Sequence, residues 1–126
     1  MSVPLTQALG GHMSLVELLL DTARADTELL GVNDAHGDNF NVPRDIDFLL
    51  LAPDEAKAQL VRNFIDDNRY GVATVMPHGD SFGIVVVVNM APQQNVLCSV
   101  SGLMACISML FGISYDGWEC DLKRRT

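Results

Sequence analysis

The sequence predicts one α+β domain in which an antiparallel sheet of four strands carries two helices on one face. Segments with apolar residues at helical spacing alternate with short β-rich runs, in the order helix and then β-α-β-β-α-β. The chain has 126 residues, of which 48% are hydrophobic and 19% are charged. This length and composition match a single folded core rather than a disordered chain.

The first predicted helix runs from Ser14 to about Asp26. Ser14 and Glu17 have the spacing of a capping box, in which the hydroxyl accepts a backbone N–H and the carboxylate reaches back to the cap. We expect residues 1–12 to be a flexible tail or a cloning remnant and residues 13–126 to form the domain. The apolar stripe of the helix is Leu15, Leu18, Leu19 and Thr22.

A long loop is predicted between Thr27 and Pro43, because turn-favouring Gly, Asn and Asp residues are frequent there. Its acidic residues partly follow the spacing of a calcium-binding EF-hand loop. However, Asn39 stands where that loop needs glycine, and Asp45 is too short for the final bidentate glutamate. We therefore expect no metal site.

The first strand is expected over residues 45–51, where acidic and apolar residues alternate before a run of three leucines. A helix follows, with Pro53 at its first position and Asp54 and Glu55 at the positive end of its dipole. It ends near Asn68, and residues 72–76 form the next strand. The predicted buried face of this helix is Ala56, Leu60, Val61, Phe64 and Ile65.

The turn-rich residues 77–81 predict a hairpin that leads to a longer strand over residues 82–90. A second long helix is predicted over about residues 93–111, ended by Gly112, and residues 115–122 supply the last strand. Its predicted sheet-facing side is Val96, Val100, Leu103, Ile107 and Leu110. This order of elements is the split βαβ pattern of ferredoxin-like domains.

The second long helix permits two further interpretations. No charged residue lies between Asp80 and Asp116, so the helix is also apolar enough to be read as a membrane span. The polar residues before it and the strands that need a cover favour a helix on the sheet, and we expect no membrane contact. The residues on its other side are small, so either the first helix or a second copy of the chain in a homodimer could pack closely against it. That side consists of Cys98, Ser101, Gly102, Ala105 and Ser108.

Charge and cysteine content limit the functional classes. Sixteen acidic and eight basic residues give a net charge of -8, which repels nucleic acid phosphates, so direct nucleic acid binding is not expected. The same charge attracts a basic protein segment, although acidic surfaces also serve solubility. Three cysteines without a CxxC pair indicate neither a disulfide framework nor a zinc site, so we expect a reducing, cytoplasmic location.

The sequence contains no recognisable set of catalytic residues. It lacks a glycine-rich phosphate loop, a nucleophile elbow and an HExxH motif, so we predict no enzyme activity and no cofactor. Asp45 and Asp47 project from one face of a strand, and solvated or Arg44-paired acids explain them more simply than a catalytic pair. The segment Tyr115-Asp116-Gly117-Trp118-Glu119 has a composition typical of recognition surfaces and also of core anchors.

Three segments together resemble the ribonuclease E inhibitor family RraB. They are Val42-Pro43-Arg44-Asp45-Ile46-Asp47-Phe48 before a strand and an acid-opened helix, Met90-Ala91-Pro92 after the hairpin, and the terminal Tyr115-Asp116-Gly117-Trp118-Glu119. The resemblance covers about residues 42–121 and agrees with the fold read from periodicity. It implies an acidic ferredoxin-like protein that binds the endoribonuclease and reduces RNA cleavage without catalysing a reaction.

The resemblance also implies a set of partner-binding residues, which either contact the partner or hold the fold. The implied partner is a protein, for which a basic segment of a ribonuclease matches the charge of this chain. A homodimeric ferredoxin-like domain that senses a small molecule is the alternative function. The predicted site residues are Arg44, Asp45, Asp47, Tyr115, Asp116, Gly117, Trp118 and Glu119.

Overall fold

The structure is a computed structural model that describes residues 13–125, so the tail expected at residues 1–12 lies outside the described part. It has seven elements. They are α1 (Leu15–Ala35), β1 (Arg44–Ala52), α2 (Glu55–Asp67), β2 (Val72–His78), β3 (Ser81–Met90), α3 (Gln94–Phe111) and β4 (Ser114–Glu119).

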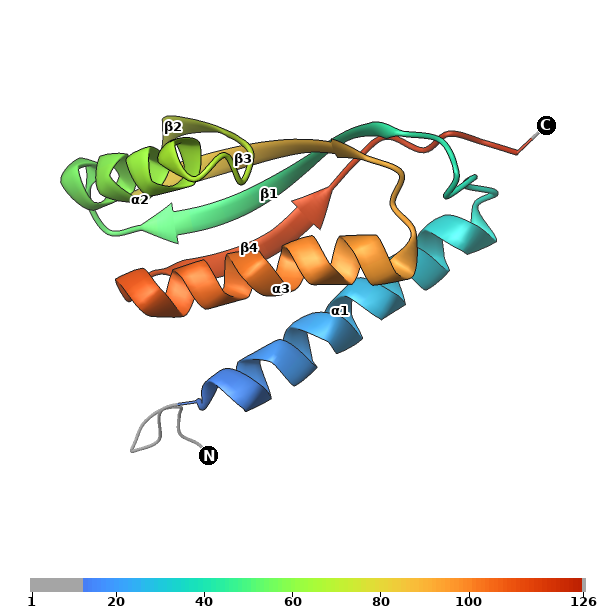
Figure 1. Ribbon diagram of the computed structural model, residues 1–126, viewed down its shortest axis with the longest axis horizontal. Coiled ribbons are helices and arrows are strands. Elements are labelled where there is room, and N and C mark those ends of the chain that lie inside the picture. Colours follow the sequence, from blue (N-terminus) through green and yellow to red (C-terminus); the bar gives the residue numbers. More distant parts are fainter. Residues whose placement is uncertain (1–12, 126) are drawn as a thin grey trace.

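The four strands form one antiparallel sheet in the order β2-β3-β1-β4, which confirms the predicted ferredoxin-like α+β fold. β1 is a central strand, because it pairs with β3 on one side and with β4 on the other. Phe48 of β1 lies opposite Val86 of β3 and Trp118 of β4. Figure 1 shows α3 lying between the sheet and α1.

The two faces of the sheet differ in burial. Along β1 the buried residues alternate with partly exposed ones, so Ile46, Phe48 and Leu50 point to one face, which we call the covered face. These residues form one core cluster with buried side chains of α2 and α3, such as Val61 and Met104. The opposite, open face carries Asp45, Asp47, Leu49 and Leu51 from the same strand.

The capping box is confirmed, but the predicted end of the first helix is wrong. The Ser14 hydroxyl accepts the backbone N–H of Glu17 at 3.1 Å, and the Glu17 carboxylate accepts the N–H of Ser14 at 3.1 Å. α1 continues to Ala35, through much of the predicted loop. Leu30 in this extension is buried in the core, and that burial outweighs the turn preference of the surrounding Gly and Asn residues.

The start and the buried face of α2 also need correction. Pro53 lies before the helix rather than at its first position, and Asp54 is the N-cap, whose carboxylate accepts the N–H of Lys57 at 2.8 Å. Leu60 and Ala56 are exposed, and Ala58 is buried instead. The buried side of α2 is therefore rotated by part of a turn from the predicted one, although Val61 and Ile65 are buried as expected.

α3 packs its small-residue side against α1, which is the first of the two predicted alternatives. Ser101 donates a hydrogen bond to Asp26 of α1, and a methyl group added at Gly102 would lie 3.5 Å from Leu19. The predicted sheet-facing side was partly wrong, because Val96 and Leu110 are exposed. Its other members lie on the core, where Ile107 is buried and Val100 and Leu103 pack against the core cluster. The core-facing residues are Leu97, Met104 and Ile107.

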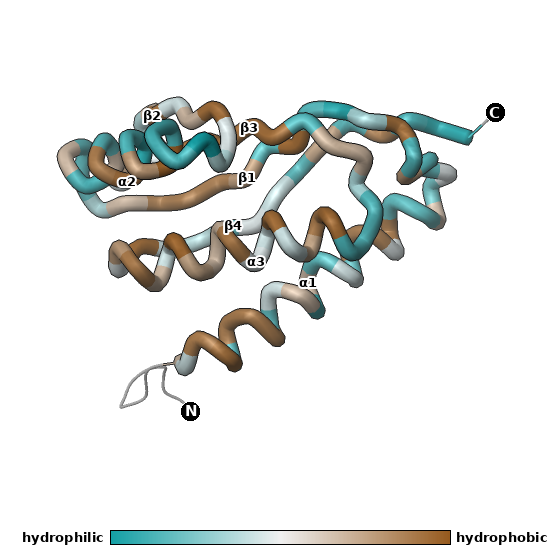
Figure 2. The backbone as a smooth tube through the Cα atoms, viewed as in Figure 1, coloured by the Kyte–Doolittle hydropathy of each residue, from teal (hydrophilic) through white to brown (hydrophobic). Residues whose placement is uncertain are grey.

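α3 is long and apolar enough to cross a membrane by length and composition alone. In the structure it covers the sheet on one side and contacts α1 on the other (Figure 1). It ends at Gly112, which has the left-handed φ of 66°. Figure 2 shows that α3 and the early part of α1 are among the more hydrophobic helical segments.

Candidate functional site

All the predicted site residues lie where β1 and β4 adjoin. The pairing of these strands places Asp47 opposite Glu119 and Phe48 opposite Trp118, although the two segments are distant in sequence. The side chains of Arg44 and Trp118 are buried, and that of Tyr115 is partly buried and bonded to α3. The more accessible members are Asp45, Asp47, Asp116, Gly117 and Glu119.

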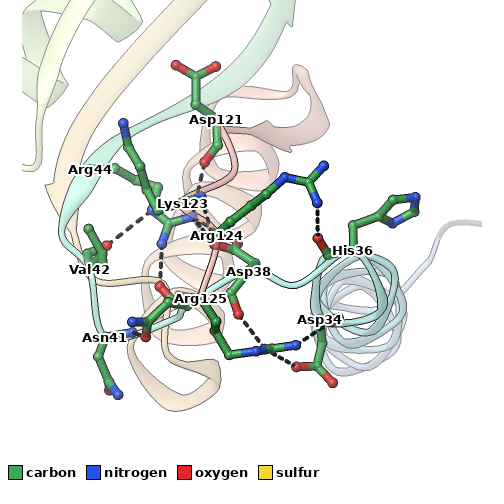
Figure 3. A network of polar contacts seen from close by, with 11 residues as sticks. Asp34, His36, Asp38, Asn41, Val42, Arg44, Asp121, Lys123, Arg124 and Arg125 are labelled. Atoms are coloured by element: carbon green, nitrogen blue, oxygen red, sulfur yellow. Dashed lines mark hydrogen bonds and ion pairs between the residues drawn. The ribbon is translucent and has the colours of Figure 1, made fainter.

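Arg44 is held inside the protein by a clamp that uses all three guanidinium nitrogens. Its Nη1 donates to both carboxylate oxygens of Asp38 at 2.7 and 2.8 Å and to the carbonyl of Asp121 at 3.0 Å (Figure 3). Its Nη2 donates to the Asn39 carbonyl, and its Nε donates to the Val42 carbonyl. Of the two simpler explanations for Asp45 and Asp47, pairing with Arg44 is wrong, because the partner of Arg44 is Asp38.

The same clamp holds the C-terminal residues against the loop before β1. The backbone N–H of Lys123 donates to the Asp38 carboxylate at 3.1 Å, and that of Arg125 donates to the Gly37 carbonyl at 2.8 Å. The Arg124 side chain donates to the His36 carbonyl (Figure 3). Most of the polar groups of this basic end are therefore used within the fold.

We expect the Asp38–Arg44 pair to be critical for stability. Asp38→Ala should lower the free energy of unfolding by about 3–5 kcal/mol, because it leaves a buried guanidinium without its counter-charge. The control is Asp21→Ala, which removes an exposed ion pair with Arg24 and should cost less than about 1 kcal/mol. Urea denaturation of both variants measures the difference, and similar losses in the two would contradict the role of the clamp.

Asp26, which the sequence analysis did not select, anchors the aromatic residues of β4. Its Oδ1 accepts hydrogen bonds from Trp118 Nε1 and from Ser101 Oγ, both at 3.0 Å. Ser101 Oγ also lies 2.8 Å from the Tyr115 hydroxyl. A sequence signal existed, because Asp26 follows Leu19 and Thr22 at seven and four residues and so continues their apolar stripe.

The Asp26 carboxyl is buried, with only 3% of the residue exposed, and no described residue bonds to its Oδ2. Burial raises its pKa above the usual value, against the opposing effect of the bonds from Ser101 and Trp118. Burial also raises the pKa of Tyr115. The folded protein therefore binds the Asp26 proton more tightly than the unfolded chain does.

This raised pKa predicts a pH-dependent contribution to stability. The stability that the protonated Asp26 contributes is fully present below the pKa of Asp26 in the unfolded chain. It is lost as the pH rises through the higher pKa of Asp26 in the folded protein. Asp26→Asn lacks this titration, so its free energy of unfolding should increase relative to wild type as the pH rises from about 3 to about 8. Urea denaturation across this range measures the difference between the two proteins. A difference that does not change with pH would count against a buried, titrating Asp26.

A β-bulge explains the spacing of the two aromatic residues. Tyr115 and Trp118 are three residues apart, yet they lie opposite Leu50 and Phe48, which are two residues apart on the covered face of β1. One extra residue in β4 makes this possible, and Gly117 has the left-handed φ of 91°. The bulge places both aromatics toward the helices and leaves Asp116 exposed.

We expect Gly117 to be required for this backbone conformation. Gly117→Ala should destabilise the protein by about 1–2 kcal/mol, because a Cβ is strained at positive φ even where space is free. Gly31→Ala is the matched control, since Gly31 is also free of neighbours but lies within α1. It should stabilise the helix by about 0.5–1 kcal/mol. Thermal unfolding compares the two variants, and a neutral Gly117→Ala would contradict the bulge argument.

Two adjoining hollows lie beside this bulge, and together they form what we call the acidic groove. One has a volume of about 230 Å³ and includes Leu49 and Val85 of the open face among its lining residues. The second has a volume of about 360 Å³ and includes Cys120. Asp47 and Glu119 belong to both. The acidic residues of the groove are Asp45, Asp47, Asp116, Glu119 and Asp121.

The carboxylates of the acidic groove are not neutralised by cations of the described chain. The four ion pairs found among residues 13–125 involve other acids, and Asp45 accepts only an amide hydrogen bond, from Asn89 at 3.0 Å. Within the same residues, no group of three or more His, Cys, Asp or Glu side chains is arranged to hold a metal ion. The groove therefore offers uncompensated negative charge beside apolar surface.

These features define a ferredoxin-like domain with an acidic surface groove. Residues 23–120 match the family model described as Regulator of ribonuclease activity B, or RraB, and the chain belongs to this family. The match confirms the resemblance read from residues 42–121 and extends it into α1, so it includes Asp26 and Asp38. Among individual curated proteins no match was found.

Proposed function

We propose that this chain is a non-catalytic regulator that binds an endoribonuclease of the ribonuclease E type in the cytoplasm and reduces its cleavage of RNA. The chain belongs to a family of regulators of ribonuclease activity. The observation that carries the proposal is the acidic groove, whose carboxylates have no cationic partner among the described residues. Such a surface attracts a basic segment of a protein partner.

The electrostatics favour the nuclease over its RNA as the partner. A net charge of -8 repels phosphates, whereas Lys and Arg residues that hold RNA on an enzyme are attracted to carboxylates. The groove would then compete with RNA phosphates for the same cations. Inhibition by this route needs binding alone and no chemical step on the regulator.

The structure gives less support to a homodimeric small-molecule sensor. That function would use a ligand space between the sheet and the helices, but Phe48, Leu97 and Met104 fill this region and are fully buried. The small-residue side of α3, which the homodimer would use, is covered by α1. We therefore retain protein binding as the proposed function.

A cleavage assay with purified ribonuclease E tests the proposal. The wild-type chain should slow RNA cleavage at concentrations near micromolar, and an enzyme lacking its basic segments should not respond. The double variant Asp47→Asn/Glu119→Gln should weaken inhibition by about tenfold, since each exposed charge contributes roughly up to 1 kcal/mol. Higher salt should reduce the difference between wild type and variant.

The matched control is Glu28→Gln/Asp67→Asn, which also removes two negative charges but from exposed positions on α1 and α2. It should inhibit nearly as well as wild type. Equal losses from the two double variants would show that net charge, rather than the groove, attracts the partner. Failure of the wild-type chain to bind the nuclease near micromolar would contradict the proposed function.

A further inference from the structure

The open face of the sheet is mostly apolar beyond the acidic groove, with Thr74 as an exposed polar residue among the apolar ones. Val72 is 69% exposed and Met76 is 42% exposed, and neither is covered by a helix. The strand register brings further apolar side chains to the same face, because Leu49 lies opposite Val85 and Val87 lies opposite Val72. We call this surface the apolar band, and it consists of Leu49, Leu51, Val72, Met76, Val85 and Val87.

The apolar band and the acidic groove form one continuous surface. Glu119, Asp47, Val87 and Val72 follow one another across the four strands in register. Neighbouring strands are about 4.8 Å apart, so acidic and apolar side chains in this row are in direct reach of one ligand. A solvated sheet face usually carries alternating polar residues, and an uncovered apolar one marks an interaction site.

Charge complementarity favours a basic segment of another protein, rather than a second copy of this chain, as the occupant of this surface. All eight basic residues of the sequence lie in the described part, and the side chains of six already donate to acceptors within the fold. Only Arg69 and Lys123 remain. A second copy would therefore bring five more groove carboxylates and few free cations. A basic segment of another protein supplies the positive charge that these carboxylates lack.

We propose that the open face binds an amphipathic basic segment of the partner, anchored by an arginine in the acidic groove. The methylene groups of that arginine lie on Leu49 and Val85, and its guanidinium lies among the carboxylates of Asp47, Asp116 and Glu119. Apolar side chains of the same segment cover the rest of the apolar band. The identity of the partner as a ribonuclease rests on the proposed function, but the chemistry of the segment rests on this surface alone.

Arginine fits this hollow better than lysine for two reasons. Its planar guanidinium forms paired hydrogen bonds with carboxylates, and it is more weakly hydrated than an ammonium group, so it loses less on contact with apolar side chains. A partner segment with lysines at the same positions should therefore bind more weakly. A preference for arginine over lysine would indicate a site shaped for the guanidinium group, because general attraction to negative charge would favour both side chains equally.

The test uses the full chain and a synthetic amphipathic peptide of about 16 residues, with Arg and Leu on one helical face. Fluorescence anisotropy measures its binding beside versions with Lys, citrulline or Ser replacements. We expect citrulline for Arg, or Ser for Leu, to weaken binding by about tenfold and Lys for Arg to weaken it by less. Equal binding of the Arg and Lys peptides, or none of the Arg peptide, would overturn the proposal.

The chain itself offers a closely matched pair of variants. Val72→Thr changes an apolar-band residue that is 69% exposed, and Val16→Thr makes the same change on α1 at a residue that is 68% exposed. Val72→Thr, alone and with Val87→Thr, should weaken peptide binding and nuclease inhibition several-fold, and Val16→Thr should change neither. Thermal unfolding checks that each variant is folded. If the double variant is unfolded, Val72→Thr alone still tests the surface.

The outcomes separate this inference from the proposed function. Inhibition of the nuclease that is equally strong in wild type, Val72→Thr and Val16→Thr would leave the regulator function standing and overturn the docking surface. Peptide binding that follows the expected pattern, without any inhibition of ribonuclease E, would support the surface and contradict the function. A dimer in light scattering that Val72→Thr dissociates and Val16→Thr does not would assign the face to a second copy and overturn the proposal.

Discussion

The pairing of β1 with the bulged strand β4 is the constraint on which the rest of the structure depends. The extra residue at the bulge points Tyr115 and Trp118 to the covered face, where Trp118 donates to Asp26 and so attaches α1 to the sheet. The same bulge leaves Asp116 at the surface, and the pairing puts Glu119 beside Asp47. One irregularity in a strand thus directs the two aromatic side chains to the core and leaves the acidic ones at the surface.

Acidic residues serve two different purposes in this protein. Asp38 and Asp26 are buried, and each meets hydrogen-bond donors that hold distant segments together. A buried acid without donors would be costly, so these contacts explain why the two carboxyls are tolerated in the interior. The acids of the groove are at the surface and meet no cation of the described chain, so their charge remains available to a partner.

Binding regulation suits the architecture of this chain. The helices cover one face of the sheet and leave the other open, where carboxylates adjoin an apolar band. A rigid antiparallel sheet holds these groups in register, so a partner segment meets a preformed surface and loses little binding energy in ordering it. The family match shows that the chain belongs to a family of regulators of ribonuclease activity, and the role of this surface in such regulation is our proposal.

The amino-acid sequence by itself determined the order of the elements, the ferredoxin-like fold and the common face of Asp45 and Asp47, because strand alternation and capping are local properties. Only the tertiary structure decided which charges are buried. Arg44 is the first residue of β1, but its side chain is buried and donates to Asp38, whose position is set by the path of the preceding loop. The sequence placed the sheet-facing side of α3 only in part, because a helix without charged residues shows little contrast between its faces until α1 and the sheet cover it. The length of α1 likewise depended on Leu30, whose burial arises from contacts with segments far along the chain.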